Sequence, residues 1–395
     1  MRKHKEQLNR KKLWTINSAS FLLGFSDAVL IYITSTYFEL ASGTENVGVF
    51  YLFSYVVLLL MLLNLHKLAK IFGNTSIFFL TLFFKIIILA LLVGAQPGVS
   101  GILMLMAYVI ITGLEWVSLD AILENFSCDN ESGRIRGKHL TIINLGFLLG
   151  PFLSTRLLDR YEFFGVFVFL LIFNMVVFIF SLIKLKDTNS SFKRDISVYK
   201  LIKKVLRRKN ILAIYYVAFV LDFFYALMII YTPIYLLSLG LDWKQIGIIF
   251  TAMLLPFVIL QYPLGVLADK KIGEKKMLIF GLGTMLFFTV TFYFARSANV
   301  LVWSIILFGT RIGAAMVEVL RDSYFYKRID GNDVDLIDFF RTAMPMGYIV
   351  AAFCSFIILL FLPLIWIFLF LAIVLASALV PAFILSENKV EKTKK

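Results

Sequence analysis

The sequence carries little charge for its length. Only 16% of its 395 residues are Asp, Glu, Lys or Arg, whereas 60% are hydrophobic and the mean hydropathy is +0.88. A water-soluble domain has about 25% charged residues, which cover its surface. We therefore exclude a soluble globular fold and expect lipid to surround most of the chain.

Cysteine and histidine are also scarce. The two cysteines, Cys128 and Cys354, are too few for a disulfide framework, and neither has the Cys or His neighbours of a zinc site. The three histidines, His4, His66 and His139, are dispersed. We expect no metal, no cofactor and no enzymatic activity, because a membrane enzyme needs a catalytic cluster. The sequence also lacks the Gly-Lys-Ser/Thr phosphate loop of an ATP-driven pump.

Long apolar runs separated by charged breaks make up most of the chain. About 20 apolar residues in a helix cross a bilayer. We predict an all-α membrane protein with twelve transmembrane helices, at about 13–38, 47–64, 74–94, 101–123, 138–159, 163–185, 211–239, 244–264, 276–295, 299–325, 339–361 and 364–385. The first run is longer than a signal-peptide core, so we take it as a retained span.

The basic residues are unevenly distributed between the loops. With the N-terminus in the cytoplasm, 32 of the 39 Lys and Arg residues fall in cytoplasmic loops or termini. Such a bias sets the orientation of membrane helices. We therefore expect an integral protein of the plasma membrane with both termini cytoplasmic. The same bias explains the net charge of +14 without a nucleic-acid partner.

One long loop divides the predicted spans into two groups of six. We predict an N-terminal bundle at 1–186, a basic cytoplasmic linker at 187–210 and a C-terminal bundle at 211–395. The halves match each other at a nearly constant offset: Asp120 and Glu124 correspond to Glu318 and Asp322, 198 residues later. Parallel repeats of this kind imply two six-helix bundles related by a pseudo-two-fold axis along the membrane normal. We expect a monomer.

The most specific motif lies between the eighth and ninth spans. It reads Gly265-Val-Leu-Ala-Asp269-Lys270-Lys271-Ile-Gly273-Glu274-Lys275-Lys276. This order of glycine, aspartate, basic residues and a second glycine resembles the loop signature of the major facilitator superfamily. The sequence departs from the signature by one extra residue before Gly273 and by Glu274 in place of a base. In the first half, Lys70 stands in place of the aspartate.

The resemblance implies two six-helix bundles that rock around a central substrate site, lined by the first, fourth, seventh and tenth spans. Gly265 is expected to allow a close helix approach. Asp269 is expected to accept hydrogen bonds at a helix N-terminus, while Lys270 holds the cytoplasmic face.

The fifth span carries Gly146, Gly150 and Pro151, similar to the glycine–proline motif in antiporter branches of that superfamily. The resemblance favours efflux. The alternative is simple tight packing, because small residues four apart allow helices to approach closely.

We single out ten ionisable residues in or directly beside the predicted spans, because such groups are costly within a bilayer and usually mark a pathway. Counting from the span starts places Asp27, Lys85, Glu115, Asp222 and Arg311 near the midplane. It places Asp120, Glu124, Glu318, Arg321 and Asp322 toward the cytoplasmic end. All but Lys85 lie on the four spans that the resemblance places around the cavity. We predict that the second group forms a gate by pairing across the halves, with solvated helix ends as the alternative.

Asp27 and Asp222 are the leading candidates for proton coupling, followed by Glu115, because a carboxyl in a low-dielectric cavity can load and unload a proton. The alternative is fixed salt bridges, for instance Lys85 with Glu115 and Arg311 with Asp222. Arg311 could instead hold a substrate anion or tune a neighbouring acid.

Aromatic residues near these charges suit an amphipathic or aromatic ligand. The candidates for lining the substrate site are Tyr32, Trp116, Tyr225 and Tyr231. The sequence therefore predicts a secondary transporter of a small solute, with proton-coupled efflux of an amphipathic compound preferred. Proton-coupled symport of a small polar metabolite is one alternative. A non-transporting receptor or lipid scramblase on the same fold is another.

Overall fold

The computed structural model describes residues 10–126, 132–185, 204–268, 272–329 and 334–387. Regular secondary structure in these ranges is entirely helical, which confirms the all-α prediction. The chain forms two compact units. The N-terminal unit comprises Met1–Thr44 and Phe53–Arg194, and the C-terminal unit comprises Glu45–Leu52 and Asp195–Lys395. Most of the predicted linker at 187–210 lies outside the described residues.

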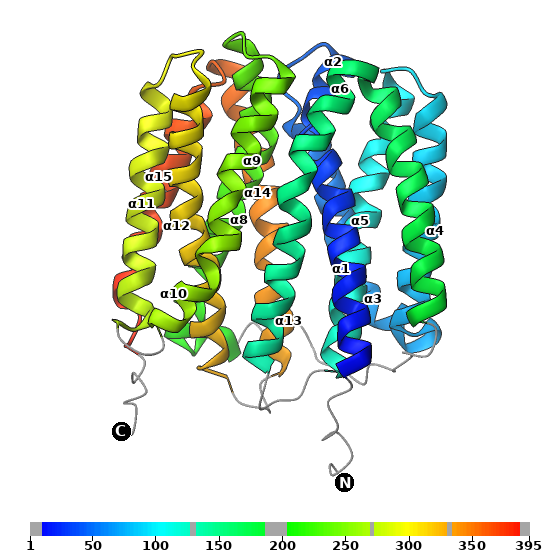
Figure 1. Ribbon diagram of the computed structural model, residues 1–395. Coiled ribbons are helices and arrows are strands. Elements are labelled where there is room, and N and C mark those ends of the chain that lie inside the picture. Colours follow the sequence, from blue (N-terminus) through cyan, green and yellow to red (C-terminus); the bar gives the residue numbers. More distant parts are fainter. Residues whose placement is uncertain (1–9, 127–131, 186–203, 269–271, 330–333, 388–395) are drawn as a thin grey trace. The chain divides into compact units, whose positions relative to one another are not determined.

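Long helices build the N-terminal unit (Figure 1). They are α1 (Arg10–Ile31), α2 (Thr34–Ser42), α3 (Gly48–Phe72), α4 (Asn74–Gly94), α5 (Val99–Phe126) and α6 (Ser132–Leu185). The first turn of α3, up to Leu52, belongs to the C-terminal unit. The main packing of α1 is against α6, while α4 packs against α5 and α6. Aliphatic and aromatic side chains from these four helices meet in one buried core, which includes Ile16, Leu82, Leu119 and Val177.

Helix α6 contains the boundary between the fifth and sixth predicted spans. Its apolar part, His139–Leu185, has 47 residues, about twice the length that crosses a bilayer. Glu162 is its one residue with non-helical torsions, at φ 53° and ψ −158°, and the chain reverses direction there (Figure 1). Pro151 therefore stays within a helical stretch and does not break it.

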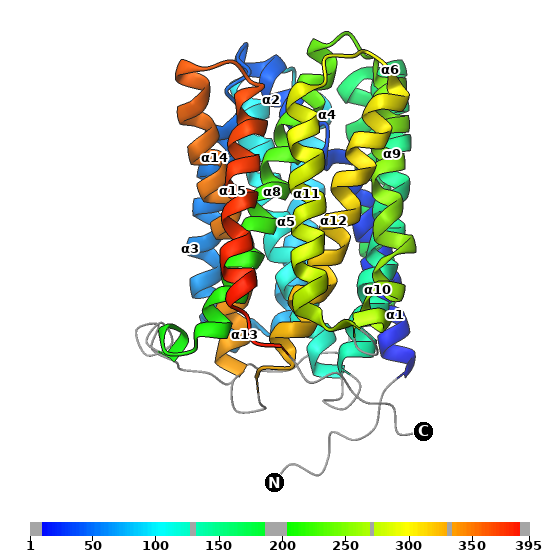
Figure 2. The ribbon, with the colours of Figure 1, turned by 90° about the vertical axis from the view of Figure 1, so that its left-hand side faces the viewer.

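The C-terminal unit also consists of long helices with two short ones. They are α8 (Lys209–Ser238), α9 (Trp243–Ile259), α10 (Gln261–Leu267), α11 (Glu274–Phe294), α12 (Val300–Tyr326), α13 (Val334–Arg341), α14 (Ala343–Phe361) and α15 (Trp366–Ile384). Helix α11 packs against α12 and α15, and α8 packs against α14 and α15 (Figure 2). Helices α8 and α12 also contact each other, and this contact brings together the charges described below.

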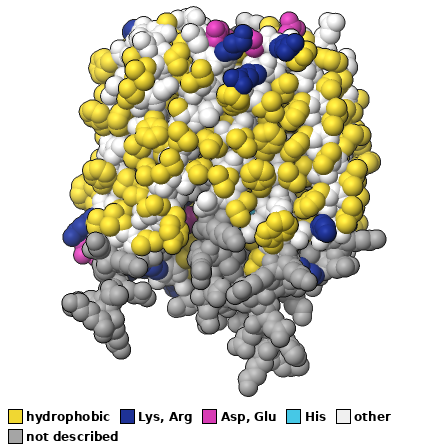
Figure 3. Space-filling model, viewed as in Figure 1, with side chains coloured by type: hydrophobic (Ala, Val, Ile, Leu, Met, Phe, Trp, Pro, Cys, Tyr) yellow, Lys and Arg dark blue, Asp and Glu magenta, His cyan; other side chains and the backbone are white. Residues whose placement is uncertain are grey.

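Eleven helical segments in the described ranges are long and apolar enough to cross a membrane. The count is one below the predicted twelve because the fifth and sixth spans form the continuous segment His139–Leu185. Large apolar side chains face outward: Phe280, Phe287 and Phe294, seven residues apart on α11, are 66%, 66% and 71% exposed. Hydrophobic side chains form a broad band on the face drawn in Figure 3, with charged side chains mostly above and below it. This surface suits a lipid environment.

Equivalent glycines precede equivalent helices in the two units. Gly73 and Gly273, 200 residues apart, have φ values of 81° and 86° and precede the 21-residue helices α4 and α11. Gly43 and Gly240, with φ values of 71° and 87°, lie in the turns before α3 and α9. Only glycine adopts this left-handed region readily. The shared turns support the internal repeat predicted from the sequence.

Candidate functional site

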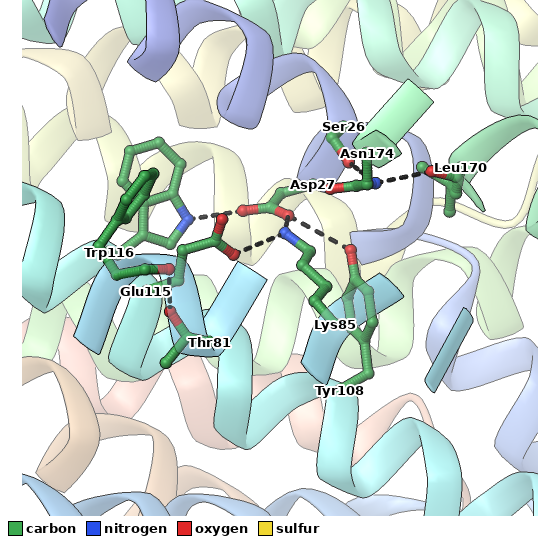
Figure 4. Close-up of polar contacts among 10 residues, drawn as sticks. Ser26, Asp27, Thr81, Lys85, Tyr108, Glu115, Trp116, Leu170 and Asn174 are labelled. Atoms are coloured by element: carbon green, nitrogen blue, oxygen red, sulfur yellow. Dashed lines mark hydrogen bonds and ion pairs between the residues drawn. The ribbon is translucent and has the colours of Figure 1, made fainter. Parts of the chain in front are cut away.

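Three charged side chains meet inside the N-terminal unit (Figure 4). Lys85 on α4 places its Nζ 2.7 Å from Asp27 Oδ1 on α1 and 2.9 Å from Glu115 Oε2 on α5. The three residues are 0%, 5% and 1% exposed, respectively. We call these three residues the Lys85 cluster. With every group ionised, the cluster has a net charge of −1 between three helices that are long and apolar enough to cross a membrane.

The two carboxylates of the Lys85 cluster are compensated unequally. Asp27 accepts hydrogen bonds from Lys85, from the Tyr108 hydroxyl at 3.3 Å and from the Trp116 indole N–H at 2.6 Å. The Lys85 ammonium also lies 5.2 Å from the centre of the Tyr108 ring. Glu115 accepts one hydrogen bond, at Oε2, while its buried Oε1 has no hydrogen-bond partner among the described residues.

Close packing between α1 and α6 holds Asp27 in place. A Cβ atom at Gly150 would lie 2.3 Å from the Cβ of Ala28, and one at Gly146 would lie 2.5 Å from the Phe21 carbonyl oxygen. Neither position has room for a methyl group. The two glycines of the fifth-span motif are thus explained by helix packing beside Asp27, which is the alternative stated above.

The remaining polar groups of α6 also anchor this crossing. Ser154 and Thr155 are buried and donate to the Pro151 carbonyl oxygen at 3.2 and 2.8 Å. From the second part of α6, Asn174 donates to Ser26 Oγ at 2.8 Å, directly beside Asp27 (Figure 4).

A second group of charges lies between α8 and α12 in the C-terminal unit. Arg321 Nη1 is 2.9 Å from Asp222 Oδ2 and also donates to the Ala218 carbonyl oxygen at 3.1 Å. Arg321 Nε is 3.5 Å from Asp322 Oδ1. The side chain of Asp322 is 32% exposed, so this Arg321 cluster is wetter than the Lys85 cluster.

Neighbouring helices fix the other groups of this region. Gln261 on α10 donates to Glu318 Oε2 at 2.9 Å. Helix α14 crosses α8 at Gly347, where a Cβ atom would lie 2.9 Å from the Phe223 amide nitrogen and 3.0 Å from the Cβ of Asp222. A glycine therefore packs beside the first-span acid in each unit.

The structure contradicts the predicted salt bridge between Arg311 and Asp222, because Asp222 pairs with Arg321. Arg311 is 2% exposed, and its guanidinium carbon lies 5.1 Å from the ring centre of Phe224 and 5.7 Å from that of Tyr225. Arg321 lies ten residues after Arg311 on α12, and it is the Arg321 guanidinium that reaches Asp222. The other predicted pair, Lys85 with Glu115, is present.

The four candidate aromatic residues have different surroundings. Trp116 belongs to the Lys85 cluster through Asp27, and Tyr225 lies against Arg311. Tyr231 is fully buried and donates to Ser355 Oγ at 2.9 Å, so it joins α8 to α14. Tyr32 is 5% exposed. Substrate contact by these residues stays a prediction.

The loop motif is described only in part. Asp269 and Lys270 lie outside the described residues. Position 273 favours glycine because its φ is 86°, in the left-handed region. A Cβ atom at Gly265 would lie 3.5 Å from Val319 Cγ1, an ordinary contact distance. Packing among the described residues therefore does not require glycine at this position, and the close helix approach expected there stays a prediction.

The unusual Glu274 of this motif ties α11 to α12. It accepts hydrogen bonds from Lys327 and, at 3.2 Å, from Ser323 Oγ. An acid at the first position of α11 also suits the positive end of the helix dipole. The departure from the family signature thus has a structural explanation.

The predicted gate depends on pairing between the two units and stays a prediction. Asp120 is partly buried, and the side chain of Glu124 lies outside the described residues. Counting by depth placed Arg321 with the cytoplasmic group and Asp222 near the midplane, yet the Arg321 side chain reaches Asp222.

Sequence reasoning named the pair of Lys85 with Glu115 but missed the bond of Lys85 to Asp27 and the role of Tyr108. One signal for Lys85 was available, since it is the sole cation near the midplane of the half that holds Asp27 and Glu115. A second signal was spacing: Tyr108 lies seven residues before Glu115, on the same face of α5.

Comparison with known families identifies the chain. The model of the Major Facilitator Superfamily matches residues 16–329 and 244–395. The comparison with curated proteins finds no match. Within the described ranges, no group of three or more His, Cys, Asp or Glu residues is arranged to hold a metal ion. The helices of the chain are those of an integral membrane protein. Because the family match covers nearly its whole length, the chain belongs to the major facilitator superfamily, whose members are secondary transporters of small solutes.

Proposed function

We propose that the protein exports an amphipathic compound in exchange for protons, and that Glu115 carries the proton. Family membership supports transport of a solute. The observation that carries the proton coupling is the Lys85 cluster, in which one buried lysine faces two buried carboxylates.

Charge balance favours a single proton in this cluster. Buried ions are costly unless they are paired and hydrogen-bonded. One proton on the Lys85 cluster brings its net charge from −1 to zero. Gain or loss of this proton changes the charge buried between α1, α4 and α5. Such a change suits a group that couples proton movement to a change of conformation.

Hydrogen bonding favours Glu115 over Asp27 as the site of that proton. Asp27 has three donors, and hydrogen bonds to a carboxylate stabilise its ionised form. Glu115 has one donor, and its Oε1 can receive a proton without breaking a contact in the described structure. Glu115, the third candidate from the sequence, thus becomes the first. Asp222 is a weaker candidate because its cluster is wetter: Arg321 also contacts Asp322, whose side chain is 32% exposed.

Efflux is supported by the resemblance of the fifth-span motif to that of antiporters. The helix packing at Gly146 and Gly150 accounts for the same residues. Symport of a small polar metabolite therefore stays the second candidate. The direction of solute movement relative to the proton gradient separates the two.

The first test follows carboxyl protonation in the purified protein by infrared difference spectroscopy between alkaline and acidic pH. We expect a protonated carboxyl band that is lost in Glu115→Gln and kept in the control Glu274→Gln. A band unchanged in Glu115→Gln would show that another group takes up the proton.

The second test measures transport in liposomes with an imposed pH gradient. Compounds come from a library of amphipathic drugs and small polar metabolites, first screened by thermal stabilisation. We expect accumulation against the solute gradient when protons move in the opposite direction. Glu115→Gln should lose this accumulation and still exchange solute across the membrane. Accumulation in the same direction as protons would establish symport, and flux indifferent to the pH gradient would refute proton coupling.

A further inference from the structure

A second buried cation, Arg311 on α12, has no acidic partner among the described residues. It is 2% exposed, and its Nη1 is buried without a hydrogen-bond partner there. A guanidinium stays charged at every accessible pH. Because a charged group within the membrane is costly without a partner, an unbalanced Arg311 calls for a functional explanation.

The nearest acids of the unit are bound by other residues. Asp222 pairs with Arg321 at 2.9 Å, and Glu318 accepts a hydrogen bond from Gln261 at 2.9 Å. Glu318 lies two turns after Arg311 on α12, and its partner Gln261 is neutral. Neither acid is a hydrogen-bond partner of Arg311 Nη1 in the described structure.

What Arg311 does contact is aromatic. Its guanidinium lies 5.1 Å from the ring centre of Phe224 and 5.7 Å from that of Tyr225, both on α8. Attraction to ring faces compensates a buried charge only in part, because rings accept no directed hydrogen bonds from the guanidinium edge in the way that carboxylates do. The edge of the guanidinium remains suited to an anion.

We propose that Arg311 binds the anionic group of the transported compound, and that this compound is a planar organic anion such as an aromatic carboxylate. A guanidinium presents paired N–H donors that match a carboxylate. The rings of Phe224 and Tyr225 provide apolar surface beside that charge. This inference rests on the proposed function and specifies its amphipathic substrate: the polar end is negative, and a cationic compound is repelled.

Direct binding tests the inference with matched probes. The probes are 2-naphthoate, its neutral analogue 2-naphthamide, inorganic phosphate and the cation tetraphenylphosphonium, each added to the purified full-length protein. We expect 2-naphthoate to bind more tightly than the amide, and Arg311→Gln to weaken the naphthoate by about tenfold or more. Arg311→Lys should retain part of the affinity, because it keeps the charge and loses the paired donors.

Two controls separate this effect from damage to the fold. The exposed Arg296, which donates to the carbonyl oxygens of Tyr293 and Ala295, supplies the matched variant Arg296→Gln, which should bind as the wild type does. The midpoint of thermal unfolding without ligand should not fall in Arg311→Gln, because that change removes an unbalanced buried charge. A marked fall would show that Arg311 is paired within the protein and would overturn the inference.

The remaining outcomes are equally decisive. Naphthoate binding that is unchanged in Arg311→Gln overturns the inference, as does tighter binding of the cation. The inference is also overturned if neither naphthoate nor phosphate binds the wild type. In that case, proton-coupled export of a neutral or cationic compound would still support the proposed function. Binding of naphthoate through Arg311 without proton-linked flux would instead refute the proposed coupling alone. Phosphate binding without naphthoate binding would overturn the planar organic class.

Discussion

The two units treat their buried charges in opposite ways. In the N-terminal unit, a single cation, Lys85, forms ion pairs with two carboxylates, and Oε1 of Glu115 has no hydrogen-bond partner in the described structure. In the C-terminal unit, Arg321 serves Asp222, while Arg311 is left against aromatic rings. The N-terminal cluster therefore holds a cation in contact with both of its carboxylates, whereas the C-terminal unit contains, beside its Arg321 cluster, a buried cation whose contacts are aromatic.

This difference arises on one repeated scaffold. The first-span acids Asp27 and Asp222 are each flanked by a glycine crossing, at Gly150 and Gly347, respectively. The cations come from different helices, from α4 in the first unit and from α12 in the second. We infer that the repeat fixes where an acid lies, whereas the position of the cation decides whether the unit suits a proton or an anion.

The largest effect is expected from removing Lys85. Lys85→Ala leaves Asp27 and Glu115 facing each other without a cation, and breaking a buried ion pair costs about 3–5 kcal/mol. The free energy of unfolding, measured by denaturant titration in mixed micelles, should fall by that amount. The control is Lys276→Ala, since the Lys276 side chain is 68% exposed and its contact with Glu387 spans 3.9 Å. Adding Glu115→Gln to Lys85→Ala should restore part of the loss. An unchanged stability would show that water compensates the cluster.

Arg321→Ala should cost less, about 2 kcal/mol, because it removes a charged hydrogen bond to Asp222 in a more exposed cluster. The same titration measures it, and Arg321→Ala combined with Asp222→Asn should recover most of the loss. A cost above that of Lys85→Ala would reverse the comparison and make the C-terminal cluster the drier of the two.

These energies depend on pairings that the sequence could predict only in part. The apolar runs predicted the helices well, and the turn predicted between 159 and 163 falls at Glu162, because membrane spans are set by length and composition. The count of separate spans differed because the chain reverses at a single non-helical residue, Glu162, within a short charged segment that is otherwise helical.

Side-chain pairing was harder to predict than the helices. The charged residues near the midplane were identified, but Arg311 was assigned to Asp222 because counting residues from a span's start gives the depth of a backbone position and not the reach of a long side chain such as that of Arg321. Lys85 was treated as the exception among the charged residues because it lies on α4, outside the four spans expected around the cavity. The charge balance of its half already indicated Asp27 and Glu115 as its partners. Burial of Gly150 against Ala28 depends on which face of α6 meets α1, which a motif alone does not give.

The glycine crossings provide the third test. Gly150→Ala should destabilise the protein by about 1–3 kcal/mol, as overpacking does, because the new methyl group would lie 2.3 Å from the Cβ of Ala28. Gly347→Ala should cost less, since its nearest atom is 2.9 Å away. Gly265→Ala is the matched control, because its new methyl group would lie 3.5 Å from Val319 Cγ1. Thermal unfolding of the three variants in detergent ranks them. Equal midpoints for Gly150→Ala and Gly265→Ala would contradict the close packing of α1 and α6.

The smallest effects are expected from two buried tyrosine hydroxyls, one in each unit. Tyr231→Phe removes a hydrogen bond of 2.9 Å to Ser355 Oγ and should cost about 1 kcal/mol. The Ser355 hydroxyl still donates its hydrogen bond to the Ala352 carbonyl oxygen in the variant, so its donor stays satisfied.

Tyr108→Phe should cost less than Tyr231→Phe, although it removes a donor from a buried carboxylate. Its hydrogen bond to Asp27 is long, at 3.3 Å, and Asp27 keeps the stronger donors Lys85 and Trp116 at 2.7 and 2.6 Å. Denaturant titration of the two variants side by side compares them on one scale. If Tyr108→Phe proves the more costly, Asp27 needs all three donors to stay ionised. The proton would then be shared between Asp27 and Glu115, and the N-terminal cluster would act as a coupled pair rather than through Glu115 alone.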